Sequence, residues 1–281
     1  MKLIADCGST KIDWCILSSK LEKQLFTLGM NAVMLTEEEM RQRFAMELVP
    51  ELGEYAGKIT EIYFYGAGCL ADEVCSNVAR ALRANIPTAT AVEVYTDLLA
   101  AARALCGNEP GISCIMGTGS NSCLYDGKAI VQNVSPLGYI LGDEGSGAVL
   151  GKLFLGDVLK NQLPADICAQ FLHEYDLDRL TIIRRVYKEP QPNRFLASVT
   201  PFLYKNIAVP EIHSLVLGSF RAFFRRNVCQ YEHFASHPVS FIGSVAYYFR
   251  EVLEEAAAAE GCTVGKITIS PMEGLLKFHS K

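Results

Sequence analysis

A short glycine turn occurs twice in the chain, and each copy carries residue types that bind phosphate. The first copy is Asp-Cys-Gly-Ser-Thr at 6–10 and the second is Gly-Thr-Gly-Ser at 117–120, each between two short apolar segments. Glycine allows close approach of the backbone to a ligand, while hydroxyl and amide groups donate hydrogen bonds to phosphate oxygens. Because the turn is repeated, we favour two phosphate-binding hairpins over two ordinary turns. The expected phosphate-binding residues are Gly8, Ser9, Thr10, Lys11, Gly117, Thr118, Gly119 and Ser120.

A carboxylate is present in only one of the two hairpins. A shift of 111 residues superimposes Asp6 on Gly117 and Gly8 on Gly119. Asp6, at the end of a predicted strand, is suited to anchor a magnesium ion through the water shell of the ion. The second hairpin would instead bring backbone amides to a terminal phosphate. We therefore expect the two hairpins to differ in role.

Two more positions follow predicted strands. Gly243, Ser244 and Val245 come after a buried strand and begin a helix, a position where N–H groups and the helix dipole favour a nucleotide or its phosphates. Asp97 lies between a strand and a helix predicted over 98–105. It could cap that helix, or it could accept the proton of a substrate hydroxyl that attacks a phosphate. The two roles are compatible.

The elements that must position these residues recur in the same order in both halves. Strands are predicted at 2–7, 12–17, 62–65 and 91–95 and then at 112–116, 122–125, 241–242 and 266–269, with helices at about 72–82, after 97, after 243 to about 259, and at 273–278. Strands alternating with helices predict an α/β fold, here an internal duplication with a ligand cleft between the copies. We expect domains at 1–108 and 109–281, with a mostly helical insertion at about 148–234 in the second.

Composition narrows the classes of function. The 281 residues are 50% hydrophobic, which is ample for a buried core, and 26 basic against 31 acidic residues give a net charge of −5. The chain therefore lacks the excess of basic residues that is expected of a nucleic-acid-binding protein. The ten cysteines include no Cys-x-x-Cys pair, and Cys15, Cys114 and Cys123 are interpreted as small core residues. With no run of 18 apolar residues, we expect a cytoplasmic protein without a membrane partner.

The chain resembles the N-acetylglucosamine kinase group, which belongs with the BadF/BadG/BcrA/BcrD ATPases in the sugar kinase, Hsp70 and actin superfamily. Besides the two glycine turns and the turn at 243–245, the most specific motif is Leu-Gly-Asp-Glu-Gly-Ser-Gly at 141–147. The resemblance covers essentially the whole chain. It implies two ribonuclease-H-like domains of the actin-like ATPase kind, with ATP and Mg²⁺ as cofactors.

The same resemblance implies roles for individual residues. Asp97 matches the base that takes the proton from the C6 hydroxyl of an amino sugar. Asn31, Gly138 and Asp143 match sugar-binding positions, and 243–245 match the turn on the adenosine side. Carboxylates are suitable acceptors for sugar hydroxyls, although Asp143 and Glu144 could also form a solvated acidic loop.

One segment departs from the family pattern. Family members commonly have Gly-Gly-Trp-Gly before the acidic run, whereas this chain has Ser-Pro-Leu-Gly at 135–138. The sugar pocket is therefore expected to have a different shape. The leading hypothesis is an ATP-dependent kinase for N-acetylglucosamine or a close relative, and N-acetylmuramic acid or glucosamine kinases stay open as alternatives.

Two other classes of protein were weighed against a kinase. An ATPase activator of a 2-hydroxyacyl-CoA dehydratase system would need accessible thiolates for an iron–sulfur cluster, whereas Cys114 and Cys123 point into strand interiors. A sugar-responsive regulator usually carries a DNA-binding module, and the chain begins directly with the phosphate-binding strand. The arginines between 179 and 226 could form the surface of a homodimer, but solvated helix faces are favoured.

Overall fold

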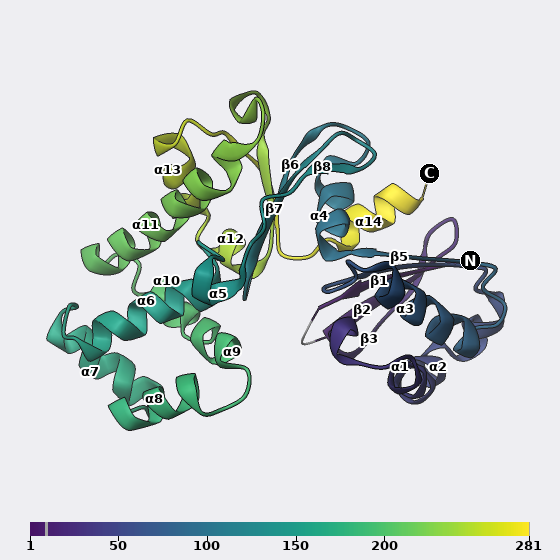
Figure 1. Cartoon of the computed structure of the whole chain (residues 1–281), viewed down its shortest axis with the longest axis horizontal. Helices are drawn as coiled ribbons and strands as arrows, with labels where there is room; N and C mark the ends of the chain where they lie inside the picture. The colour runs from purple at the N-terminus through teal and green to yellow at the C-terminus, as the bar shows by residue number, and fades with distance from the viewer. Residues whose placement is uncertain (9–10, 281) are drawn as a thin grey trace. The chain divides into compact units, whose positions relative to one another are not determined.

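The chain forms two compact units in the computed structural model, which describes residues 1–8 and 11–280. Unit 1 contains residues 1–108 and 270–280, and unit 2 contains residues 109–269. Each unit is built on one five-stranded sheet with helices on its faces (Figure 1). Within the described residues, no helix is both long and apolar enough to span a membrane.

Unit 1 has a mixed sheet in the order β3-β2-β1-β4-β5. Its strands are β1 (Lys2–Cys7), β2 (Lys11–Leu17), β3 (Leu21–Leu28), β4 (Glu61–Gly66) and β5 (Ala91–Thr96). Its helices are η1 (Ala32–Met34), α1 (Glu37–Arg43), η2 (Phe44–Leu48), α2 (Val49–Leu52), η3 (Gly53–Lys58), α3 (Asp72–Asn85), α4 (Asp97–Cys106) and α14 (Met272–His279). Apolar side chains cover both faces of the central strands, as expected where helices pack on both sides of a sheet. Trp14, Phe44 and Phe64 pack together on one face, while Ile4 and Tyr65 lie on the other.

Unit 2 repeats this sheet in the order β8-β7-β6-β9-β10. Its strands are β6 (Gly111–Met116), β7 (Ser120–Tyr125), β8 (Ile130–Gln132), β9 (Val239–Ile242) and β10 (Val264–Thr268). Its helices are α5 (Gly138–Leu141), α6 (Gly147–Leu159), α7 (Ala165–Glu174), α8 (Arg179–Tyr187), α9 (Pro192–Ala197), α10 (Thr200–Lys205), α11 (Pro210–Arg226), η4 (Val228–Gln230), η5 (Phe234–Ser236), α12 (Ser244–Tyr248) and α13 (Arg250–Ala259). In both sheets the first strand of the unit pairs antiparallel with the second and parallel with the fourth. The predicted duplicated α/β fold is thereby confirmed.

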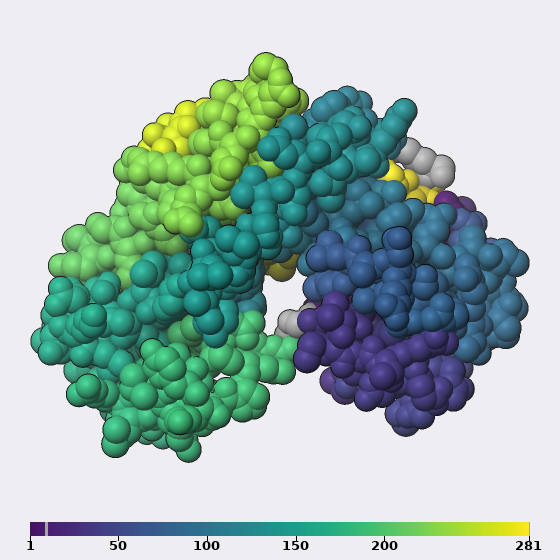
Figure 2. Space-filling view, in the orientation of Figure 1, coloured from purple at the N-terminus to yellow at the C-terminus, as the bar shows by residue number. Residues whose placement is uncertain are grey.

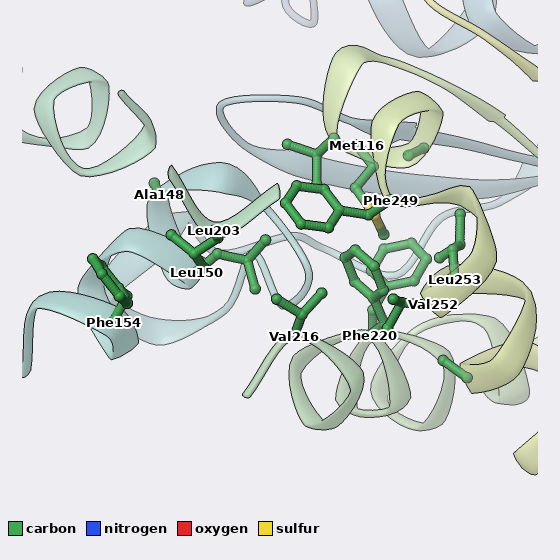
Figure 3. Packing of buried hydrophobic residues seen from close by; sticks show 14 of the residues in the cluster. Met116, Ala148, Leu150, Phe154, Leu203, Val216, Phe220, Phe249, Val252 and Leu253 are labelled. Atoms are coloured by element: carbon green, nitrogen blue, oxygen red, sulfur yellow. The ribbon is translucent and has the colours of Figure 1, made fainter. Parts of the chain in front are cut away.

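The predicted helical insertion corresponds to the run of helices from α6 to η5. These helices, coloured teal to green, form much of the surface of unit 2 on the face that Figure 2 shows. They pack through a large apolar cluster that also contains the inner face of the sheet. Figure 3 shows part of this cluster, in which Met116, the last residue of β6, lies beside Phe249 and Phe220. The core of unit 2 thus supports the end of the strand from which the second glycine turn begins.

The offset of 111 residues between the two hairpins is wrong. The outermost strand pairs are Cys7 with Ile12 and Met116 with Ser120, so the first turn holds four residues and the second holds three. Counted from the turns, Gly8 corresponds to Gly117. A gapless shift cannot represent this difference in loop length. Asp6 comes one residue before the last residue of β1, and the residue at the same place in β6 is Ile115, not Gly117. The second hairpin therefore still lacks the carboxylate.

The C-terminal helix also departs from the predicted boundary, because α14 packs in unit 1 and not with residues 109–269. It lies beside α4 (Figure 1), and a Cβ on Gly274 would be only 2.3 Å from the carbonyl oxygen of Ala104. At the end of α14, Nε2 of His279 is 2.8 Å from the hydroxyl of Tyr65. The chain therefore passes between the units twice. Periodicity alone could not assign α14, because an amphipathic helix does not reveal which sheet it covers.

Candidate functional site

Three carboxylates gather at one end of the sheet of unit 1. The pairing of β1 with β2 places Asp6 directly opposite Asp13, and Asp97 follows β5 as the first residue of α4. Asp13 is buried and accepts hydrogen bonds from Nε2 of Gln24 at 2.8 and 3.1 Å. Burial, followed by the charges of Asp13 and Asp97, raises the pKa of Asp6 to about 7. A cation at this point would favour ionisation of Asp6.

The capping role considered for Asp97 belongs to its neighbour. Thr96 is the N-cap of α4, and its hydroxyl accepts a hydrogen bond from the N–H of Leu99 at 3.1 Å. Oδ1 of Asp97 accepts from the N–H of Leu98 at 2.9 Å, and burial raises the pKa of Asp97. A carboxylate fixed by the backbone and with a raised pKa is a better general base than an ordinary aspartate. Asp97 is therefore available for chemistry without loss of the cap.

Asn31 lies after β3, close to a second glycine segment of unit 1. Its Oδ1 accepts a hydrogen bond from the N–H of Val33 at 3.2 Å. A Cβ on Gly68 would lie 2.7 Å from this oxygen, and Gly68 has a φ of +84°. Glycine at this position thus lets the turn after β4 approach Asn31. The exposed side chain of Asn31 keeps its amide NH₂ available to a ligand.

The second glycine turn is held by the beginning of a helix. The N–H of Gly147 donates to the carbonyl of Gly117 at 2.8 Å, and the N–H of Ala148 donates to that of Thr118 at 3.1 Å. Ser146 caps the same helix, α6, by accepting from the N–H of Val149. The turn is consequently fixed by the first amides of a 13-residue helix whose positive dipole end lies beside it. This arrangement favours an anion next to the turn.

The two acidic residues of the 141–147 run have different environments. Asp143 adopts a φ of +52°, and its carboxylate accepts from the N–H of Ser120; burial raises its pKa to about 6. Glu144 instead forms an ion pair with Arg226, with 2.6 Å between Oε1 and Nε. The hydroxyl of Ser120 donates to the carbonyl of Glu144 at 2.8 Å, which ties the run to the glycine turn. Asp143 is thus partly desolvated beside the turn, whereas Glu144 has a structural partner.

The third predicted turn packs directly against the second. Gly243 has a φ of +129°, and a Cβ there would lie 2.3 Å from the carbonyl oxygen of Met116, so only glycine fits. Ser244 and Val245 begin α12 and line a largely apolar pocket of about 350 Å³. The other residues that line it are Thr200, Pro201, Tyr204, Tyr248 and Phe249. Aromatic side chains next to a strand–helix turn can stack on a planar base.

The structure adds little information on several of the predicted phosphate- and sugar-binding residues. Ser9 and Thr10 lie outside the described residues. The N–H of Gly8 donates to the carbonyl of Lys11 at 3.1 Å, and the ammonium group of Lys11 lies 4.6 Å from the centre of the Phe26 ring. Gly138 begins the short helix α5 with a φ of +74°. Gly8, Lys11 and Gly138 thus lie in or beside turns, and none of their described contacts indicates a ligand.

The residues around Asp6 suit a metal held mainly by water and phosphate. Within the described residues, no group of three or more His, Cys, Asp or Glu side chains could enclose a metal ion. Mg²⁺ usually keeps several waters and uses one or two carboxylates together with substrate phosphates. Asp6 and Asp13, which lie opposite one another on neighbouring strands, supply the one or two carboxylates that this mode of binding needs.

Several neighbours of the predicted residues carried no signal in the sequence. Asp13 and Gln24 form a polar pair across two strands. The strand that supplies Gln24, β3, was not predicted, because only one of its eight residues is buried and it lacks an apolar run. Tyr204 and Arg226 come from the helical insertion yet lie beside Ser244 and Glu144. No periodicity within a helix indicates which turn its side chains will reach.

Comparison with known proteins identifies the family. The chain is 48% identical to a protein of known structure from Porphyromonas gingivalis described as a candidate N-acetylglucosamine kinase, with a TM-score of 0.96 over 100% of this chain and 99% of that one. A second candidate N-acetylglucosamine kinase, from Chromobacterium violaceum, shares the fold at 15% identity, with a TM-score of 0.74 over 99% and 98% of the chains.

The fold extends to more distant sugar kinases. A ROK family glucokinase from Streptomyces griseus, solved with glucose and AMPPNP, matches with a TM-score of 0.56 at 13% identity over 99% of this chain and 97% of that one. No protein-family model and no curated protein sequence matches the chain. The extent and identity of the first match show that this chain belongs to the family of the Porphyromonas gingivalis candidate N-acetylglucosamine kinase, within the two-domain sugar kinase fold.

Proposed function

We propose that the protein is an ATP-dependent amino-sugar kinase that transfers the γ-phosphate of ATP to the C6 hydroxyl of N-acetylglucosamine or a close relative. The observation that carries this proposal is the 48% identity, over the full length, to a candidate N-acetylglucosamine kinase. The glucokinase neighbour bound to AMPPNP supports ATP as the phosphate donor. At a finer level, we place the chain among the BadF/BadG/BcrA/BcrD ATPases and in the cytoplasm.

In this proposal Asp97 is the general base. Its carboxylate takes the proton of the C6 hydroxyl as the hydroxyl oxygen attacks the γ-phosphorus, and the bond between that phosphorus and the β–γ bridging oxygen breaks to leave ADP. The raised pKa of Asp97 favours proton acceptance. Asn31, Gly138 and Asp143 hold the sugar, so that the hydroxyl is oriented before it reacts.

The remaining residues bind ATP. The turn at 117–120, supported by the N-terminus of α6, contacts the terminal phosphates through the N–H groups of Thr118 and Gly119, since those of Gly117 and Ser120 are bonded to Gly119 and Asp143. Gly8 to Lys11 form the second phosphate-binding turn. Gly243, Ser244 and Val245 hold the adenosine side, with the base in the pocket beside Tyr204 and Tyr248. Asp6 holds Mg²⁺ through water, and the ion, when bound, neutralises negative charge on the phosphates.

The test is ADP release by the purified protein with ATP, Mg²⁺ and a panel of hexoses and amino sugars. We expect turnover with N-acetylated amino sugars and little with ATP alone, and ¹³C and ³¹P NMR of the product should place the phosphate on C6. A protein that hydrolyses ATP at the same rate with and without every sugar is not a sugar kinase. Phosphate on C1 would overturn the proposed acceptor.

A further inference from the structure

The sheet of unit 1 ends at the edge strand β5. Within the described residues, β5 pairs with β4 alone, in parallel and without a bulge. Its sequence, Ala-Val-Glu-Val-Tyr-Thr, contains no proline and no lysine. An edge strand exposes backbone N–H and C=O groups that can pair with a strand of another chain, and proteins commonly block such an edge with a proline, a lysine or a bulge. Because β5 has none of these, it is able to extend the sheet.

A groove of about 490 Å³ lies between this edge strand and α3, which packs beside β5 in unit 1 (Figure 1). Helix α3 contributes Cys75, Ala79 and Arg83 to the lining, and β5 contributes Val92 and Val94. A strand that pairs with the free edge of β5 would lie along this groove. Its own apolar side chains would then cover the two valines, and a helix attached to it would lie next to α3.

The side of α3 that borders the groove has an ordered set of charges. Four residues lie in one line along the helix, at intervals of four, three and four positions: Asp72, Ser76, Ala79 and Arg83. Asp72 and Arg83 are exposed, and within the described part of the chain neither side chain forms a hydrogen bond or an ion pair. The line therefore begins with an acid, has small residues in the middle and ends with a base. Small residues allow two packed helices to approach closely.

This order of residues is complementary to itself. In a dimer with a two-fold axis, a residue that contacts a second residue of the other copy receives the same contact in return. Two copies of α3 that pack antiparallel place Asp72 opposite Arg83 of the other copy, twice, with Ser76 opposite Ala79 between them. The same axis makes the two β5 strands antiparallel, the direction in which edge strands pair directly. An acidic peptide on the groove would satisfy Arg83 but would leave Asp72 beside a like charge.

We propose that unit 1 forms a symmetric dimer with a second copy of this chain, in which the two β5 strands pair and join the two sheets. Reciprocal ion pairs between Asp72 and Arg83 fix the register of the two α3 helices. Like charges across an interface oppose association, so these two residues also exclude partners with a different charge pattern. The dimer does not depend on the proposed kinase function.

The experiment measures the dimer Kd of the full chain by sedimentation equilibrium. We expect a reversible dimer for the wild type. Asp72→Arg brings bases together at both contacts and Arg83→Asp brings acids together, so each single variant should raise Kd at least about tenfold. An equimolar mixture of the two single variants should associate again, because each supplies the charge that the other lacks. The double variant, with both substitutions in one chain, should return to within about threefold of the wild-type Kd.

The matched control is Glu73→Arg, which makes the same change of charge in the first turn of α3 but about 100° further round the helix. It should leave Kd within about threefold of the wild type. Hydrogen exchange of the amides of β5 should be slower in the wild-type dimer than in Asp72→Arg at the same protein concentration.

Three results would overturn the proposal. The first is a wild type that stays monomeric at concentrations up to about 100 μM, which is too weak for a specific dimer. The second is a dimer whose Kd is the same in both single variants, or a mixture of these variants that fails to associate. The third is a dimer in which the exchange of the β5 amides equals that in Asp72→Arg, because the strands then do not pair.

Discussion

A Cβ atom on Gly119 would lie 3.1 Å from Oδ2 of Asp143. The side chain of Asp143 therefore lies close to the turn, and its carboxylate also accepts a hydrogen bond from the N–H of Ser120. In the proposed function, both substrates would contact this segment of unit 2. The carbonyl of Glu144, which accepts the hydroxyl hydrogen of Ser120, fixes the same segment from the other side.

Gly119→Ala should therefore displace Asp143 by a few tenths of an ångström. Because misplacement of a binding group weakens orientation of the substrate, we expect KM for the sugar to rise about tenfold and kcat to fall. Steady-state kinetics with each substrate varied will measure both. Gly156→Ala, at an open position inside α6, is the control and should leave KM unchanged. An unaltered KM in Gly119→Ala would show that this contact does not position Asp143 for the sugar.

Asp97→Asn should reduce kcat by about 10²- to 10⁴-fold, the usual contribution of a general base, and should not lower stability. Thr96→Ala should do the opposite: loss of the N-cap costs about 1 kcal/mol of unfolding free energy, with kcat nearly unchanged. Measuring kcat and urea unfolding for both variants separates catalysis from capping. If Asp97→Asn retains most of its kcat, Asp97 is not the base.

The sequence predicted the order of elements better than it predicted the neighbours of the motifs. The glycine turns and the buried cysteines such as Cys114 could be recognised, because turn chemistry and strand hydrophobicity are local properties. The pairing of Asp13 with Gln24 and the docking of α14 could not, because they depend on which surfaces meet after folding. The hairpin offset failed for a related reason, since one added turn residue changes the register of everything that follows.

Tyr248→Ala should raise KM for ATP about tenfold, because stacking of a base on an aromatic ring contributes roughly 1–3 kcal/mol. Tyr248 lines the pocket beside Ser244 and Val245. Tyr248→Phe keeps the ring and should behave like the wild type, while Tyr187→Ala removes an exposed tyrosine of α8 and serves as the surface control. Nucleotide affinity is measured by titration with AMPPNP. Equal affinities of Tyr248→Ala and wild type would place the base elsewhere.

The contact between Tyr65 and His279 predicts a pH-dependent stability of unit 1. Burial, followed by the charges of Arg103 and Lys2, lowers the pKa of His279 from 6.5 to about 4. Because the folded state resists protonation of this ring, the stabilisation is complete above pH 6.5 and is lost as the pH falls from 6.5 to 4. The largest loss is about 3 kcal/mol, at roughly 1.4 kcal/mol for each pKa unit.

His279→Gln keeps an acceptor for the Tyr65 hydroxyl and does not titrate. Trp14, the only tryptophan, is buried in unit 1, so its fluorescence reports the unfolding of this unit in urea. The difference in unfolding free energy between wild type and His279→Gln should shift by about 2–3 kcal/mol in favour of the variant between pH 7.5 and pH 4.5. The carboxylates titrate equally in both proteins, so their contributions to the unfolding free energy cancel in the difference. A difference that is constant with pH would mean that His279 is protonated as readily in the folded chain as in the unfolded one, and that α14 docks without a titrating contact.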